Sequence, residues 1–431
     1  MSLIARLGAT SRLATAAVLA AGLSVAFAAP AQAQKKADKA AAATPKASYS
    51  KPFIAVYQPF AVKAKAEGDA TQLKAEIPAV IAAATTADDK FAAGQAVYGL
   101  GAKLKDTGLQ KQGVGLMVDS GSSLVAAERP KLLYALSQLY YQDKDWANAK
   151  LRAEQALAAG FTGEAELLLS EVYFAQNNAT GALDVLDKAM AKKVAAGQPI
   201  PEAWLKRAIA KSYEAKLEPQ SVKYSGMFAQ YYPSATSWGD AIAIQRNLRN
   251  YTGQDLLDLM RLASRAKALR NERDYVDYIE AADARRLPGE TQRIIDAGIA
   301  AGLLKTNDVY VNEARTVAAG RIKADTADLA NLERDARLGS ANATTLMAAG
   351  DAFLSYQQPA KAEEFYKLAL AKPGVDTPRV LTRLGIAQLD QRKFAEADAN
   401  FLKVQGARQG IAQLWAIYAK QGAAPAAGPT S

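Results

Sequence analysis

Residue patterns that could support catalysis are few in this chain, and each of them is incomplete. The 431 residues include no His and no Cys, which excludes Ser-His-Asp and Cys-His nucleophile arrangements and the paired His ligands of metallopeptidase zinc sites. Ser48-Tyr49-Ser50-Lys51 has the Ser-x-x-Lys spacing in which a Ser attacks and a Lys shares the proton transfer. No Lys-Thr-Gly motif accompanies it in the sequence, so we interpret it as a chance match.

Paired carboxylates are the other candidates for chemistry. Asp88-Asp89 and Glu363-Glu364 could in principle serve glycoside hydrolysis, which needs two acids that face each other across a bond. The chain has 43 acidic residues, so adjacent pairs carry little information. We therefore predict that these pairs are solvated charges on helix faces.

Metal and phosphate motifs are also incomplete. Asp143-x-Asp145 begins like a calcium-binding loop, but the required Gly and closing Glu are absent, and a turn between helices fits it better. No Gly-Lys-Ser/Thr phosphate loop occurs. The sequence predicts a protein without catalytic activity, cofactor or metal.

The elements that would position any site follow from internal repetition. Two segments near the C-terminus match at an offset of 35 residues. The matched pairs are Leu346 and Leu381, Gly350 and Gly385, Ala362 and Ala397, and Tyr366 and Phe401. A period of this size, with apolar residues at helical spacing, is typical of stacked helical hairpins.

A second repetition lies in the first half of the chain at an offset of 33 residues. Here each unit has apolar and small residues on two helical stretches, separated by a polar turn. The first copy comprises Leu133, Leu136, Ser137, Tyr141, Trp146, Ala149, Ala153 and Ala156, and the second Glu166, Leu169, Ser170, Phe174, Ala179, Ala182, Leu186 and Ala189. Small residues allow two helices to approach closely at their crossing point.

These segments resemble the tetratricopeptide repeat (TPR) family. The first helix of that family's motif has a large apolar residue, then Leu, then either Gly or Ala, and then Tyr. Its second helix has Ala, an aromatic residue and a second Ala. Residues 346–373 match well, through Leu346, Gly350, Ala362, Tyr366, Ala369 and Pro373. Residues 381–404 match with Val404 in place of the second Ala, and residues 133–189 match moderately. The resemblance implies an all-α, right-handed superhelical solenoid of stacked helix-turn-helix repeats.

The remaining segments are helical but less regular. Residues 91–105 and 114–118 could form an earlier hairpin, and residues 53–57 are the only plausible strand, with an ordered lead-in to the repeats as the alternative. Between 234 and 340 the helical pattern breaks at several Gly and Pro positions, and we expect atypical hairpins that continue the superhelix, with a separate all-α domain as the alternative. Residues 408–420 fit a helix that caps the last apolar edge of the array.

The two ends of the chain indicate an exported protein. Residues 1–33 have the positive start, apolar run and small residues of a secretory signal, and no later segment has the length and apolarity of a membrane span. We expect the periplasm of a Gram-negative bacterium, and neither nucleic-acid binding nor an integral membrane protein. The predicted organisation is a signal peptide (1–33), a disordered Lys/Ala-rich tether (34–51), N-terminal repeats (52–233), irregular hairpins (234–340), C-terminal repeats with a capping helix (341–421) and a disordered tail (422–431).

The TPR resemblance also implies partner-binding residues, because the inner face of the family's superhelix is built from the first helix of each hairpin. The matching positions are Lys131, Tyr134, Gln138 and Tyr141 in one unit, and Glu171 and Phe174 in the next. Tyr and Phe combine large contact area with limited flexibility, which suits recognition of extended peptides.

A basic segment is the second candidate for binding. It contains Arg261, Arg265, Lys267, Arg270 and Arg273. The formal net charge of the chain is +10, and an anionic envelope component or acidic protein surface is a candidate partner for this segment. The alternative is a soluble surface balanced by the neighbouring Asp255, Asp258, Asp274 and Asp277.

The sequence favours a non-catalytic periplasmic TPR scaffold that binds proteins or peptides through a concave helical groove. One alternative is a glycan-binding factor, or an accessory factor in polysaccharide or protein export. The least favoured alternative is a wall-active enzyme that uses carboxylates.

Overall fold

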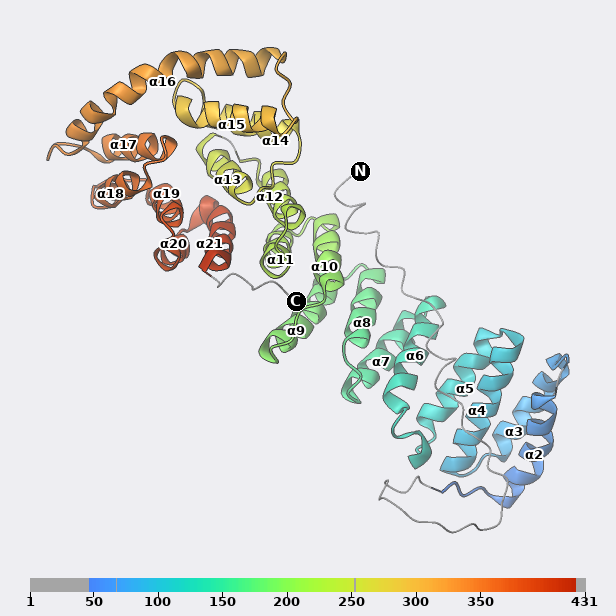
Figure 1. Ribbon diagram of the computed structural model, residues 1–431. Helices are drawn as coiled ribbons and strands as arrows, with labels where there is room; N and C mark the ends of the chain where they lie inside the picture. The colour runs from blue at the N-terminus through green and yellow to red at the C-terminus, as the bar shows by residue number, and fades with distance from the viewer. Residues whose placement is uncertain (1–45, 67, 252, 424–431) are drawn as a thin grey trace, which may run out of the picture. The chain divides into compact units, whose positions relative to one another are not determined.

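The computed structural model describes residues 46–66, 68–251 and 253–423 (Figure 1). Every regular element among them is a helix, and none is a strand, which confirms the predicted all-α class. The predicted signal peptide, most of the tether and nearly all of the predicted tail lie outside these residues. None of the described helices combines the length and the apolarity that a membrane crossing requires.

The chain divides into two compact units, which we call the N-terminal and C-terminal units, between Pro199 and Ile200. In each unit, successive helices pack against one another in pairs. The N-terminal unit contains α2 (Lys51–Lys65), the 3-10 helix η1 (Thr71–Glu76), α3 (Ile77–Ala83), α4 (Ala87–Leu104), α5 (Thr107–Asp119), η2 (Ser123–Val125), α6 (Arg129–Gln142), α7 (Trp146–Ala158), α8 (Glu164–Ala175) and α9 (Ala179–Ala195).

The C-terminal unit contains the other helices. The first two of them, between residues 202 and 231, fall within the block predicted from the sequence as N-terminal repeats (52–233). The helices of this unit are α10 (Glu202–Glu214), α11 (Glu218–Tyr231), α12 (Ala235–Arg249), α13 (Gly253–Arg265), α14 (Glu272–Ala282), α15 (Pro288–Ala300), α16 (Val309–Ala336), α17 (Ala343–Ser355), α18 (Pro359–Leu370), α19 (Thr377–Asp390), α20 (Phe394–Phe401), η3 (Gly406–Arg408) and α21 (Gln409–Ala423).

The hairpins share one turn geometry. In seven of the described hairpins, one residue of the turn between the two helices has a positive φ, in the left-handed region. These residues are Lys105, Lys144, Asn177, Lys216, Lys267, Gln357 and Arg392. The α13–α14 hairpin of the irregular middle segment therefore turns in the same way as the repeats on either side of it along the chain.

Close contacts within the C-terminal hairpins explain the 35-residue repetition. A Cβ atom added to Gly350 of α17 would lie 2.5 Å from the Tyr366 ring of α18. A Cβ on Gly385 of α19 would lie 2.5 Å from the Phe401 ring of α20. Each hairpin thus packs a second-helix aromatic ring directly on a first-helix glycine, and this contact accounts for two of the matched positions.

The segment from Phe53 to Tyr57 is helical, so it does not form the strand that its sequence made plausible. The Ser50 side chain caps α2 by accepting a hydrogen bond from the Phe53 backbone N–H. Phe53, Tyr57 and Phe60 then form one buried face of the helix. Their spacing of four and three residues fits a helical period rather than the two-residue period of a strand.

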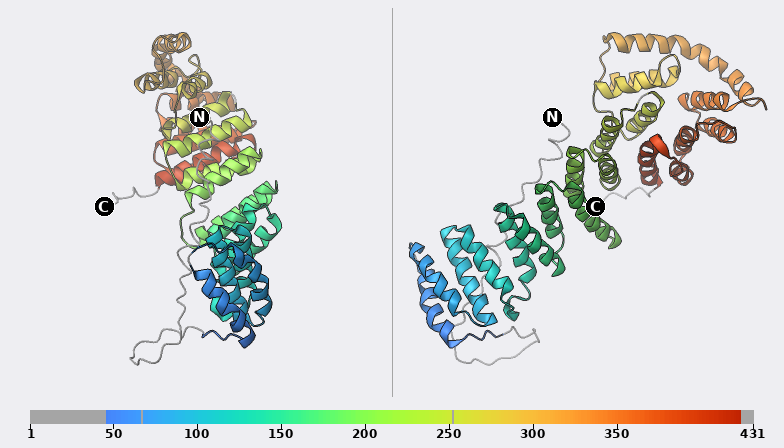
Figure 2. Two further views of the ribbon diagram at one scale, coloured as in Figure 1. Left: turned by 90° about the vertical axis from the view of Figure 1, so that its right-hand side faces the viewer. Right: turned by 180° about the vertical axis from the view of Figure 1, so that it is seen from behind.

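The last helix does more than cap its neighbour. Helix α21 packs on α20, as expected, and also contacts α11, α13 and α19. Trp415 Nε1 donates to the Asp258 carbonyl at 3.0 Å, and the Tyr418 hydroxyl donates to the Arg265 carbonyl at 3.0 Å. The C-terminal unit therefore closes on itself, and both views of Figure 2 show the red C-terminal helices beside the yellow-green ones.

The longest helix of the C-terminal unit is α16, which has 28 residues. It packs on α15 and then on α17, as Figure 1 shows. Its buried residues are Val311, Ala318, Leu329 and Ala336. Most of its surface is exposed, because only this sparse stripe faces the neighbouring helices.

Candidate functional site

The residues predicted to bind a partner lie along the first helices of two N-terminal hairpins. On α6, Lys131, Tyr134, Gln138 and Tyr141 follow one another at spacings of three and four residues, so they share one helix face. Lys131 is exposed and forms an ion pair with Glu128 at 3.4 Å. Gln138 and Tyr141 are half-buried.

Tyr134 is buried beneath the exposed side chains of this face and is not part of its surface. Its side chain is 5% exposed and its ring stacks on Phe161 with centroids 4.9 Å apart. Its hydroxyl accepts a hydrogen bond from Gln138 Nε2 at 2.9 Å, and burial raises the pKa of Tyr134 to about 12. We therefore correct the prediction for Tyr134, because a buried phenol cannot contact a partner.

The α8 positions divide in the same way. Glu171 is buried, with 6% exposure, and leaves the candidate surface for that reason. Phe174 is half-buried, as is Tyr141, whose ring meets Trp146 edge-on at 5.3 Å. The N-terminal surface face is therefore defined by Lys131, Gln138, Tyr141 and Phe174.

The basic segment of the C-terminal unit does not form one surface. Arg261 is 1% exposed and pairs with Glu290 at 2.6 Å, so its place in the predicted basic patch is corrected. Arg265 pairs with Asp390 at 2.6 Å, and Arg270 pairs with Asp240 at 2.8 Å. The two remaining residues are Lys267, which occupies the α13–α14 turn, and Arg273, which is largely exposed.

Arg261 instead belongs to a connected group of ion pairs, which we call the arginine cluster. Among the described residues it contains five arginines and four carboxylates. These are Arg261, Arg286, Arg379, Arg383 and Arg408, with Asp255, Asp258, Glu290 and Asp351. They come from α13, α15, α17, α19, η3 and the α14–α15 connection, so the cluster joins four α-helices of the C-terminal unit to segments that precede α15 and α21.

Asp258 is the centre of the arginine cluster. It is fully buried and forms ion pairs with Arg261, Arg383 and Arg408. Although burial alone would raise the pKa of Asp258, these three positive charges lower it to about 2. Asp258 therefore stays ionised at neutral pH, which allows three buried guanidinium groups to remain paired.

Two helices far apart in sequence lie in register across the cluster. Three pairs of residues on α13 and α19 that are each 125 positions apart are in contact. These contacts link Gln254 to Arg379, Asp258 to Arg383, and Arg265 to Asp390. The constant offset means that α13 and α19 run parallel, with facing sides joined by charged side chains along their length.

The arginine cluster is poorly suited to proton transfer at neutral pH. Burial alone would raise the pKa of Glu290, but the positive charge of Arg261 lowers it. The resulting pKa of Glu290 is about 2. Burial raises the pKa of Tyr278 and Tyr366 well above the ordinary value. A general acid or base works best with a pKa near the operating pH, so these groups hold charges and hydrogen bonds in place.

The carboxylate pairs singled out in the sequence have structural roles, and two members are not solvated as predicted. Asp89 is fully buried, and its carboxylate accepts hydrogen bonds from the backbone N–H and hydroxyl of Ser50 and from the backbone N–H of Thr86. Glu363 is 4% exposed and pairs with Lys367 and Lys393, both at 2.7 Å. Each carboxylate is buried because polar groups of neighbouring segments converge on it.

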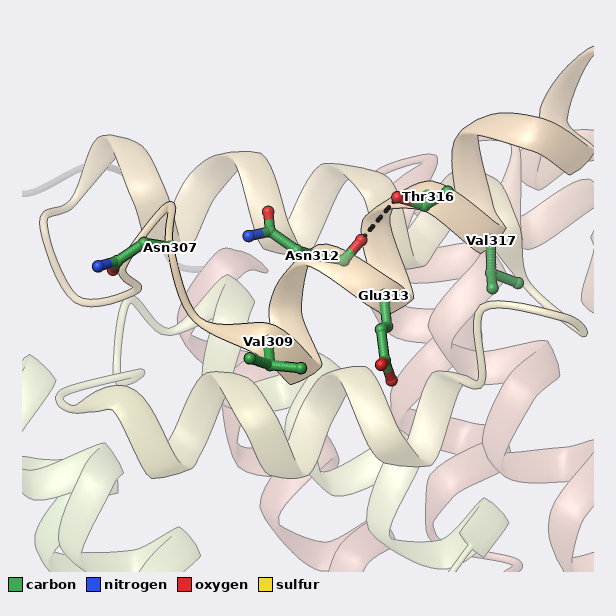
Figure 3. Close-up of a pocket in the computed structure, with 6 residues that line it drawn as sticks. All are labelled: Asn307, Val309, Asn312, Glu313, Thr316 and Val317. Atoms are coloured by element: carbon green, nitrogen blue, oxygen red, sulfur yellow. Dashed lines mark hydrogen bonds between the residues drawn. The ribbon is translucent and has the colours of Figure 1, made fainter.

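A shallow depression of about 550 Å³ lies along the start of α16 (Figure 3). It is lined by Asn307, Val309, Asn312, Glu313, Thr316 and Val317. Thr316 Oγ1 donates to the Asn312 carbonyl at 2.8 Å, so this hydroxyl is used within the helix. The lining comes from one continuous segment, and no group of three metal-ligating side chains occurs among the described residues.

Sequence reasoning missed the arginine cluster as a unit. Asp258 was interpreted as a surface counter-charge, and Arg408 as the start of a capping helix. Asp351, Arg379 and Arg383 gave no signal, because their partners are distant in sequence. Comparison with protein-family models and with curated proteins finds no match to this chain.

Proposed function

We propose that the protein is a non-catalytic, exported scaffold that binds other proteins through the α6–α8 face of its N-terminal unit. In this proposal the hairpins are TPR-like repeats wound into a right-handed superhelix, and the protein works in the periplasm. The Gly350–Tyr366 and Gly385–Phe401 contacts and the shared left-handed turns support the repeat interpretation.

The contrast between the two sets of first helices carries the proposal. In the C-terminal unit, the facing sides of α13 and α19 are joined by their own charged side chains, so they leave no room for a partner between them. In the N-terminal unit, Lys131, Gln138, Tyr141 and Phe174 all reach the surface. This contrast supports α6 and α8 as the binding surface in our proposal.

The chemistry of this face suits a polypeptide ligand. Two half-buried aromatic rings supply apolar area whose side chains have little conformational freedom to lose. Gln138 and Lys131 lie on the same face of α6 as Tyr141 and can donate hydrogen bonds. Such a combination recognises an extended segment with apolar side chains and exposed carbonyl or carboxylate oxygens.

A cross-linked pull-down of the full chain from its native envelope fraction tests the proposal. We expect one dominant protein partner, lost on Tyr141→Ala and weakened on Lys131→Ala. Tyr231→Ala, at a Tyr with 39% exposure in the other unit, and Lys188→Ala, at another exposed and paired Lys, are the matched controls.

The Tyr141→Ala variant must keep the helical circular dichroism signal of the parent chain if its loss of the partner is to support the proposal. Loss of the helical signal would show that Tyr141 is a core residue and would remove it from the binding face. Recovery of glycan or lipid without protein would overturn the proposal and favour a glycan-binding or export accessory factor. Release of fragments in wall-digestion assays would favour an enzyme.

A further inference from the structure

The arginine cluster has an excess of positive charge, and that excess lies at its open edge. Its six members with 6% side-chain exposure or less are three arginines and three carboxylates, so they balance. The other three are Asp255, which pairs with Arg408, and the two arginines Arg286 and Arg379. The side chains of Arg286 and Arg379 are 40% and 21% exposed.

Both of these arginines share a carboxylate that is already saturated. Asp351 pairs with Arg383 through both oxygens, at 2.6 and 2.7 Å, and also accepts the Tyr366 hydroxyl at 2.8 Å. Arg286 and Arg379 contact the same Asp351 oxygen at 3.3 and 3.4 Å. These longer contacts show that the two outer guanidinium groups are the weakly held members of the set.

Donor use separates Arg379 and Arg286 from Arg383, while Arg408 shares with Arg379 a buried Nε that has no hydrogen-bond partner among the described residues. Arg383 employs all three of its nitrogens, towards Asp258, Asp351 and Gln254. Arg379 uses only Nη2, and its Nε is buried without a hydrogen-bond partner among the described residues. Since each guanidinium has five N–H donors, Arg379 and Arg286 together leave several donors unused beside one another.

We propose that Arg286 and Arg379 form a binding site for an oxyanion, either a carboxylate or a tetrahedral sulfate or phosphate group, on a small ligand. The planar guanidinium fork matches both kinds of group, and an anion here would neutralise the excess charge and take up the unused donors. Burial and the charge of Arg383 lower the pKa of Arg379, which is the electrostatic signature of a cation short of counter-charge.

Calorimetric titration of the full chain with sodium phosphate, sulfate or acetate, at constant ionic strength set with sodium chloride, tests this site. We expect saturable binding of at least one oxyanion, and affinity reduced about tenfold or more by Arg379→Gln or Arg286→Gln. Arg285→Gln, at the exposed neighbour of Arg286, is the matched control and should bind as the parent does. Acetate alone would identify a carboxylate site, and sulfate or phosphate alone a tetrahedral one.

Thermal unfolding under the same conditions separates a site from a general salt effect, since sulfate and phosphate stabilise many proteins by exclusion from their surface. Stabilisation that does not saturate, or that persists in both Arg→Gln variants, would overturn the proposal. Because Arg286 is partly exposed, Arg286→Gln is expected to keep the fold, as circular dichroism would verify. No saturable binding of any of the three anions to the folded parent chain would also overturn it.

Discussion

The N-terminal and C-terminal units are built from the same kind of helical hairpin, but they differ in which charged side chains are buried and in what these side chains are paired with. The buried charged residues of the N-terminal unit are Asp89, Glu166 and Glu171 among those described, all of them carboxylates. Asp89 and Glu166 are satisfied by backbone or hydroxyl groups that start a helix, and for Asp89 these include Ser50 at the start of α2 as well as its own N-cap Thr86. The C-terminal unit buries Arg261, Arg383 and Arg408 as well, and pairs them with carboxylates on distant helices.

This difference shows that hairpin geometry alone does not decide how an array presents its first helices. Asp89 and Glu166 are satisfied by polar groups at helix starts, and the first helices α6 and α8 of that unit keep Gln138, Tyr141 and Phe174 at the surface. Where charges are shared between α13 and α19, their facing sides become part of the protein's interior. A buried ion pair contributes little net stability compared with apolar packing, but removing one partner is strongly destabilising.

The largest expected effect comes from Asp258→Asn, which removes the counter-charge of three buried arginines while keeping the shape of the side chain. We expect the C-terminal unit to lose about 3 to 5 kcal/mol of stability, and the N-terminal unit to keep its own. Urea unfolding followed by limited proteolysis, with fragments assigned by mass spectrometry, would report each unit separately.

Asp255→Asn is the matched control for this substitution. Asp255 contacts Arg408, as Asp258 does, but its side chain is 35% exposed. Its loss should cost less than about 1 kcal/mol. Equal effects of the two substitutions would contradict the view that burial of the cluster makes it sensitive.

The next largest effect is expected from acid, which should destabilise the C-terminal unit more than the N-terminal unit. Asp258 and Glu290 have folded-state pKa values of about 2, below their ordinary values of 3.8 and 4.5. Because these pKa values are lowered, the stabilisation is fully present above pH 4.5 and is lost as the pH falls towards 2. Each group contributes roughly 2 to 3 kcal/mol over that range, and both lie in the C-terminal unit.

Tryptophan fluorescence can follow this loss in one unit. Trp146 lies in the N-terminal unit, whereas Trp204, Trp238 and Trp415 lie in the C-terminal unit. In Trp146→Phe, fluorescence therefore reports the C-terminal unit, and far-ultraviolet circular dichroism reports both. We expect the fluorescence transition at a higher pH than the loss of half the helical signal, and coincident transitions would count against the comparison.

What the sequence could predict follows from the range of the interactions. The Gly350–Tyr366 and Gly385–Phe401 contacts lie within single hairpins, so they appear as a repeated pattern. Most ion pairs of the arginine cluster join residues about 30 to 150 positions apart. Asp258 also has an opposite charge three residues away, in Arg261, and that nearby pair was interpreted as part of a helix surface. One sequence contains no periodicity that would pair Asp258 with Arg383, so the closure of the C-terminal unit could not be predicted.

The smallest expected effects concern the packing that the two units share. Gly113→Ala places a methyl 2.4 Å from the Tyr98 backbone nitrogen, and Gly350→Ala places one 2.5 Å from the Tyr366 ring. We expect each to cost about 1 to 3 kcal/mol in its own unit, from overpacking, with the larger cost at Gly113 because a backbone atom cannot turn aside as a ring can. Urea unfolding with proteolysis of each unit would measure both.

Gly320→Ala is the control for this pair, because α16 is open at that point and a Cβ there meets nothing within 4 Å. It should stabilise the protein by about 0.5 to 1 kcal/mol through helix propensity alone. If Gly113→Ala and Gly350→Ala behaved like Gly320→Ala, close helix contact would not explain the glycine at either position. The hairpins of both units would then pack without the close approach that we infer at these glycines.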